Sequence, residues 1–76
     1  MVFEKVRSVV AKILKVEEEK ITMETSLVND LGADSIDAVE IIMELEDQFD
    51  IEFDDESTQN VQKIGDIVDY IETHKN

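Results

Sequence analysis

Few residues in this sequence could carry out covalent chemistry on their own. There is no cysteine, and the one histidine, His74, stands two residues from the end of the chain. Serine or threonine nucleophiles need a neighbouring base, and carboxylates that act as an acid–base pair need burial to separate their pKa values. The two glycines do not form a phosphate-binding loop, and residues 46–56 lack the central glycine of a calcium loop. The residue chemistry therefore predicts that the chain is not an enzyme.

Negative charge dominates the composition. Twenty Asp and Glu residues against seven Lys and Arg give a formal net charge of −13 and a pI near 4.1. Phosphate binding requires clustered basic residues, so nucleic acids are excluded as partners, and anionic membrane surfaces are disfavoured for the same reason. We expect basic patches on other proteins to be the natural partners of this chain.

The hydrophobic content and its distribution along the chain exclude two further classes of protein. A hydrophobic content of 42% is too high for a disordered acidic tail. No apolar run approaches the ~18 residues that a membrane span requires. The sequence predicts a cytoplasmic protein, or a mature organellar form whose transit peptide has been removed, and Met1 favours the first. We expect a monomer that does not insert into membranes.

The chain of 76 residues is long enough for one domain, residues 1–76, and too short for two. Apolar residues recur at three- and four-residue steps without β-type alternation, which predicts an all-α fold. We expect a small four-helix bundle with three main helices, about 2–16, 35–50 and 65–73, and a short helix about 56–60. The long first loop carries apolar residues that should pack against the bundle, namely Ile21, Met23, Leu27, Val28 and Leu31.

The start of the second helix is better defined by the sequence than the start of the last one. Asp34 is a good N-cap residue, and Asp37 at the third helical position completes a capping box with a shorter acid than usual. Acids at this end also complement the helix dipole. Lys63, in contrast, stands where a Ser, Thr or Asp cap of the last helix is expected.

The second helix contains more apolar residues than one helical face can hold. One set fits the core, namely Ala38, Ile41, Ile42, Leu45 and Phe49. The other apolar residues form a ridge displaced toward the surface, namely Ile36, Val39 and Met43. Acids surround this ridge, namely Asp34, Asp37, Glu40, Glu44 and Asp47. The periodicity fits two interpretations equally well, a recognition surface for other proteins or a helix buried on two sides.

The charge pattern separates these two interpretations. No Lys or Arg occurs between Lys20 and Lys63, whereas thirteen acids lie in residues 21–62. Such a run usually forms a solvated face, but here the repulsion along the helix is uncompensated, a cost that interspersed lysines would remove. Attraction of basic partners explains the run better, and it favours the ridge as a recognition surface.

The segment Leu31–Asp37, Leu-Gly-Ala-Asp-Ser-Ile-Asp, resembles the phosphopantetheine attachment motif of acyl carrier proteins, L-G-x-D-S-L-D. Residues 39–46, 49–52 and 69–71 are also similar to that family, so the resemblance covers essentially the whole chain. Three departures stand out: Ile36 replaces the usual leucine, Phe53-Asp54 replaces an aliphatic residue and proline, and residues 57–63 match poorly. Seven residues in register at the start of an acidic helix are a specific signal.

The resemblance implies that a carrier-protein synthase transfers 4'-phosphopantetheine from coenzyme A to Ser35. Asp34 would support the serine or the Mg²⁺ used in that transfer, and the serine would need no base of its own. Weak divalent-cation binding near Asp34 and Asp37 is expected, rather than a specific metal site. The arm would carry growing acyl chains as thioesters to the enzymes of dissociated (type II) fatty acid biosynthesis.

The same resemblance assigns roles to two further groups of residues. Basic patches on the partner enzymes would recognise Ile36, Asp37, Val39, Glu40, Met43 and Glu44. The bundle core would open to shelter the acyl chain among Ile41, Leu45, Phe49, Ile67 and Ile71. Two alternatives stay open: a specialised carrier for polyketide, peptide or D-alanyl transfer, and an acidic helical adaptor with no prosthetic group.

Overall fold

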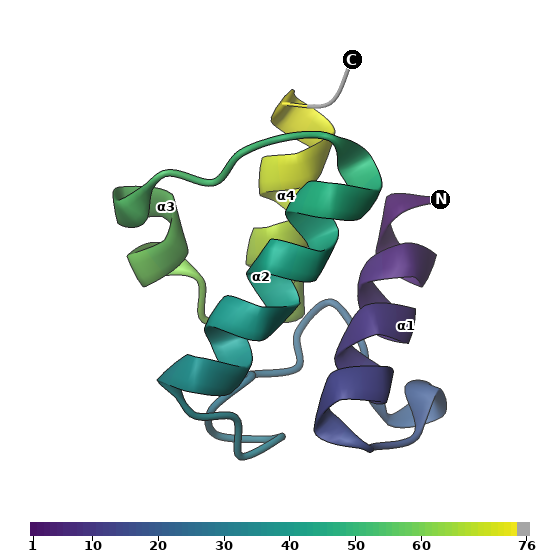
Figure 1. Ribbon diagram of the computed structural model, residues 1–76. Helices are drawn as coiled ribbons and strands as arrows, with labels where there is room; N and C mark the ends of the chain where they lie inside the picture. The colour runs from purple at the N-terminus through teal and green to yellow at the C-terminus, as the bar shows by residue number, and fades with distance from the viewer. Residues whose placement is uncertain (75–76) are drawn as a thin grey trace.

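The computed structural model describes residues 1–74. Within that range the chain forms four α-helices and one short 3₁₀ helix, α1 (Val2–Leu14), η1 (Glu18–Lys20), α2 (Ser35–Phe49), α3 (Asp55–Asn60) and α4 (Ile64–His74) (Figure 1). The described residues contain an isolated antiparallel bridge, between Ser26 and Lys63, and no longer strand. The predicted all-α bundle with a long first loop is confirmed, and every helix end lies within two residues of its expected position. The 3₁₀ helix was not predicted.

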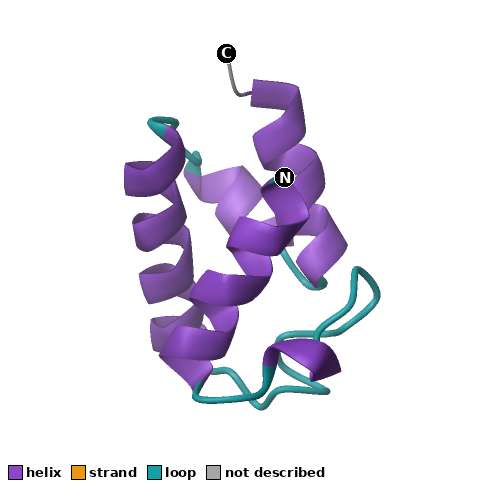
Figure 2. Cartoon of the chain, turned by 90° about the vertical axis from the view of Figure 1, so that its right-hand side faces the viewer, coloured by secondary structure: helices purple, strands orange, loops and turns teal. Residues whose placement is uncertain are grey.

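The bundle core is built around α1, which packs against both α2 and α4. Figure 2 shows α1 lying between these two helices when the molecule is viewed from its side. Each of the three contributes fully buried side chains to one cluster, among them Val6, Val10, Ile41, Leu45, Ile67 and Ile71. Burial of each such side chain contributes about 1.5–3 kcal/mol, so helix packing alone can support this cysteine-free domain.

The first helix ends two residues before its predicted end at residue 16. Lys15 adopts the left-handed conformation, with φ 58°, and its backbone N–H donates to the Ala11 carbonyl. A left-handed residue satisfies a free carbonyl at the helix end and turns the chain away. The apolar pattern continues to Val16, which is half-buried, and hydrophobic periodicity alone therefore placed the end too late.

The long first loop packs against the core through only some of its apolar residues. Ile21 and Leu27 are buried and Leu31 is half-buried, as expected, whereas Met23 and Val28 are exposed. The expectation that these two side chains are packed away is wrong. Successive hydrogen bonds close residues 26–32 into a turn, which points Leu27 inward and leaves its neighbour Val28 outside.

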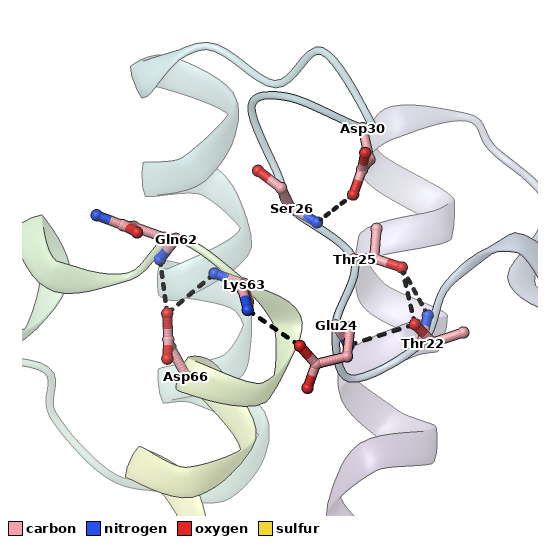
Figure 3. Close-up of polar contacts among 8 residues, drawn as sticks. All are labelled: Thr22, Glu24, Thr25, Ser26, Asp30, Gln62, Lys63 and Asp66. Carbon is pink, nitrogen blue, oxygen red and sulfur yellow. Dashed lines mark hydrogen bonds and ion pairs between the residues drawn. The ribbon is translucent and has the colours of Figure 1, made fainter.

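The start of α4 is capped from within the helix. Oδ2 of Asp66 accepts hydrogen bonds of 3.0 Å from the backbone N–H groups of Gln62 and Lys63 (Figure 3). These are donors that a helix start otherwise leaves unsatisfied. Lys63 itself is therefore no cap, and the capping oxygen comes from an acid three residues later that reaches back.

The loop is fastened to this same helix start. Nζ of Lys63 lies 3.0 Å from Oε1 of Glu24, and this hydrogen bond raises the pKa of Lys63 (Figure 3). Two backbone hydrogen bonds lie beside this ion pair. The Ile64 N–H donates to the Thr25 carbonyl at 3.0 Å, and the Gly65 N–H donates to the Met23 carbonyl at 2.8 Å. The loop that precedes α2 is therefore a fixed part of the bundle.

The short helix α3 is confirmed close to its expected range of about 56–60, and it begins directly after Phe53-Asp54, where the sequence departs from the family pattern. Asp54 caps α3 by accepting the Ser57 N–H at 2.7 Å. Phe53 is buried and stacks on Tyr70, with ring centroids 4.1 Å apart, and the Tyr70 hydroxyl donates to the Glu52 carbonyl at 2.8 Å. Figure 1 shows α3 set to the side of α2, away from α1.

A glycine at the end of α2 should stabilise the fold. Asp50 follows the helix in the left-handed conformation, with φ 54°, which costs an L-residue about 1–2 kcal/mol. We expect Asp50→Gly to raise the free energy of unfolding by about 1 kcal/mol, measured by urea denaturation. Asp47→Gly is the matched control, because it removes the same charge inside the helix and should destabilise by about 1 kcal/mol. Changes of the same sign in the two variants would contradict this account.

Candidate functional site

The serine of the motif occupies the first position of α2, and its side chain is exposed. The capping box predicted from the sequence fixes it there. Oδ1 of Asp34 accepts the Asp37 N–H at 2.8 Å, and Oδ2 of Asp37 accepts the Asp34 N–H at 3.4 Å. These two bonds determine where the helix begins, and they leave the Ser35 hydroxyl directed to solvent.

Ser35 differs in setting from the other three serines. Ser8 lies within α1, and the hydroxyl of Ser26 accepts the Asn29 N–H at 3.1 Å inside the loop turn. Ser57 is half-buried, and its backbone N–H and hydroxyl lower the pKa of Asp54 by hydrogen bonding. Ser35 alone combines exposure with a position at the start of a long helix.

This position fits a phosphate ester. The first N–H groups of α2, those of Ser35 and Ile36, have no acceptor within the helix, and the positive end of the helix dipole lies beside them. Asp34 and Asp37 would repel an anion, but each carboxylate is turned back onto a backbone N–H. A phosphodiester on the serine hydroxyl could therefore extend into solvent without displacing a packed side chain.

The apolar ridge of α2 is exposed. Ile36 is 69% exposed, Val39 46% and Met43 60%. The inward set lies on the opposite side, where Ile41, Ile42 and Leu45 are buried and Ala38 is half-buried. Of the two interpretations of the periodicity, the structure selects an outward ridge over a helix buried on two sides.

Acids border this ridge along the length of α2. Glu40 is exposed, Asp37 is half-buried by its capping role, and Glu44 accepts a 3.0 Å hydrogen bond from the Gln48 amide. A groove also runs between the ridge and α1, and it is lined by Ser8, Val9, Lys12, Ile13, Glu40, Met43, Glu44, Asp47 and Gln48. The sequence analysis missed the α1 side of this groove, since nothing in the periodicity of α1 indicates which helix lies beside it.

The residues expected to shelter an acyl chain lie together in the core. Ile41, Leu45, Ile67 and Ile71 are fully buried. Phe49, at the last turn of α2, is only half-buried and packs at the edge of the cluster. Its place in the lining of the acyl chain stays a prediction, and its ring lies at the edge because the helix ends there and the chain turns away at the next residue.

His74 lies far from the motif in sequence, at the end of α4, and it is exposed. The sequence analysis did not foresee that its ring stacks on Tyr70, with centroids 3.9 Å apart, while Nδ1 lies 2.8 Å from the Tyr70 carbonyl. The imidazole thus extends the aromatic stack of α4 and has a packing role.

Residues 1–74 contain neither a membrane-spanning helix nor a cluster of metal-binding side chains. No helix there is long and apolar enough to cross a membrane, and no group of three or more His, Asp or Glu side chains is placed to hold a metal ion. Weak cation binding near Asp34 and Asp37 stays a prediction.

Comparison with known proteins agrees with this geometry. The family described as "Phosphopantetheine attachment site" matches residues 4–71. A protein of Clostridium acetobutylicum named "Acyl carrier protein" is 51% identical over 74 residues, which cover 97% of this chain and 96% of the relative. The fold is similar to the solved structure of a Mycobacterium tuberculosis protein assigned to the acyl carrier proteins, with TM-score 0.91, 33% identity, and 96% of this chain and 97% of that chain covered.

Loss of the capping acid should destabilise the start of α2. We expect Asp34→Ala to lower the free energy of unfolding by about 1 kcal/mol, because the Asp37 N–H loses its acceptor. Asp34→Asn keeps an oxygen in the same place and should cost much less. Urea denaturation of both variants tests this, and equal losses would show that the charge, rather than the cap, stabilises the helix.

Proposed function

The chain belongs to the acyl carrier protein family, whose members hold acyl groups on covalently attached phosphopantetheine, and we propose that Ser35 is the attachment site in this chain. The family consists of carriers rather than catalysts. When bound, the phosphopantetheine arm supplies a thiol that holds acyl groups as thioesters, a chemistry that this cysteine-free chain cannot provide from its own side chains.

The proposal rests on the setting of Ser35. This serine is exposed, and it occupies the first position of a capped helix within the motif Leu31–Asp37. A transferase would approach this hydroxyl without moving any element of the bundle. Asp34 stands beside it and, by analogy with the family motif, would support the serine or a Mg²⁺ ion while the phosphate is transferred from coenzyme A.

Recognition of the enzymes that load and extend the acyl chain is assigned to α2. The exposed ridge of Ile36, Val39 and Met43 supplies an apolar contact. The acids beside it, Asp37, Glu40 and Glu44, would attract basic patches and increase the rate of association. The ridge begins directly behind Ser35, so an enzyme that docks on α2 has the base of the arm next to its surface.

Shelter for the acyl chain is assigned to the core between α2 and α4. Ile41, Leu45, Ile67 and Ile71 would separate to admit the chain, with Phe49 at the edge. Of the pathways that use such carriers, we favour dissociated (type II) fatty acid biosynthesis in the cytoplasm over specialised polyketide, peptide or D-alanyl transfer. The intense acidity and the Asp-Ser-Ile-Asp start of α2 support this choice.

Modification of the chain tests the proposed site. Incubation of the apo protein with a broad-specificity phosphopantetheinyl transferase, coenzyme A and Mg²⁺ should add the mass of one arm, as seen by intact-mass spectrometry. Ser35→Ala should gain nothing, while Ser8→Ala should be modified as the wild type is. An arm on the Ser35→Ala protein would refute the assignment, and an unmodified wild type would favour the adaptor without a prosthetic group.

The role of the acids in association can be tested by charge reversal. Glu40→Lys should raise the KM of the transferase for the carrier several-fold, because it places a repulsive charge beside the ridge. Glu72→Lys, on the exposed face of α4, changes the net charge equally and should have a smaller effect. The difference should shrink as salt is added. Equal increases in KM for both variants would indicate that only the net charge of the carrier matters, and not the position of the acid.

A further inference from the structure

Methionine is the only sulfur-containing residue type in the chain, because there are three methionines and no cysteine. All three are exposed to different degrees, Met1 by 90%, Met43 by 60% and Met23 by 38%. A thioether in contact with solvent can be oxidised to the sulfoxide, and the reaction is reversible by methionine sulfoxide reductases. The three sites differ in what such a change would do.

Met43 occupies the critical position of the three. It belongs to the exposed ridge of α2 and also lines the groove between α2 and α1, beside Ile13. Glu40 and Glu44 stand on either side of it along the helix. Its side chain thus belongs both to the apolar ridge and to the groove, and three acids, Glu40, Glu44 and Asp47, line the α2 side of that groove.

The other two methionines lie outside this surface. Met1 precedes α1, where its amino group pairs with Glu4 at 3.9 Å. Met23 lies in the first loop against the start of α4, and its carbonyl accepts the Gly65 N–H at 2.8 Å. Neither is part of the ridge, so their oxidation should leave partner docking nearly unchanged.

We propose that Met43 is a reversible oxidation site through which peroxide weakens the docking of partner enzymes, an inference that rests on the recognition role of α2 proposed above. A lone pair on Sδ attacks one oxygen of hydrogen peroxide, so that an S–O bond forms and the O–O bond breaks. The second oxygen of the peroxide takes up the proton of the transferred oxygen and leaves as water. The sulfur is oxidised by two electrons and the peroxide is reduced by two.

The sulfoxide changes the ridge without changing the fold. Because Met43 is 60% exposed in the free protein, its new oxygen stays hydrated and the packing of α2 against α1 is maintained. In a complex the same oxygen would have to lose its water in an apolar contact, which is unfavourable unless a donor faces it. The negative end of the added S–O dipole also lies between two acids, Glu40 and Glu44, and Lys12 is the one basic residue in the groove lining.

The test isolates Met43 in the apo protein by the double substitution Met1→Leu/Met23→Leu, produced behind an N-terminal tag that is cleaved off, because translation itself begins with a methionine. This protein is treated with hydrogen peroxide, freed of peroxide, and presented to a phosphopantetheinyl transferase with coenzyme A. We expect kcat/KM to fall about tenfold relative to the untreated protein, with an unchanged circular dichroism spectrum. Treatment with both stereospecific methionine sulfoxide reductases should restore kcat/KM to the value of the untreated protein. Complete oxidation of Met43, verified by peptide mass spectrometry, with unchanged kcat/KM would overturn the inference.

Met43→Leu is the matched control, and its kcat/KM after peroxide treatment is compared with its own kcat/KM before treatment. Whatever its starting kcat/KM, peroxide treatment should leave that value within about twofold, since the other two methionines lie outside the ridge. An equal loss in this variant would place the effect elsewhere and contradict the proposal. If the untreated double variant and the untreated wild type accept no arm at all, the proposed function fails, and the inference about Met43 fails with it.

Discussion

The capping box at the start of α2 is the interaction on which the rest of the site depends. Two reciprocal hydrogen bonds between Asp34 and Asp37 decide which residue begins the helix. They place Ser35 in its first turn, exposed, with free backbone donors beside it. The 3.6-residue period of the same helix, with its apolar set packed on the core, places Ile41 and Leu45 inward and Ile36, Val39 and Met43 outward. The proposed attachment point and the proposed recognition surface therefore lie on one helix whose start the capping box fixes.

The acidic surface has a physical cost that the fold accommodates elsewhere. Residues 21–62 contain thirteen acids and no basic residue, so α2 cannot relieve repulsion by ion pairs along its own length. Its stability comes instead from the apolar contact with α1, while Lys63, just outside the acidic run, pairs across the fold with Glu24, 39 residues away in the sequence. The bundle can therefore keep an uncompensated acidic helix on its surface.

Local signals in the sequence were sufficient to predict the helices, the Asp34 cap and the outward ridge, because each depends on residues within one or two turns. Features that depend on distant residues were missed. Met23 and Val28 have the same apolar character as Ile21, and only the folded turn decides which of them is exposed. One local feature was also missed, the Asp66 side chain that accepts the backbone N–H groups of Gln62 and Lys63, four and three residues before it. The groove at Lys12 exists only because α1 lies beside α2.

The central claim is that acyl groups are carried on an arm attached at the start of α2. The most direct measurement is fragmentation mass spectrometry of the modified protein, which assigns the phosphopantetheine to one residue among the four serines of the chain. The account predicts that every fragment bearing the arm contains Ser35. An arm located on Ser8, Ser26 or Ser57 would contradict it.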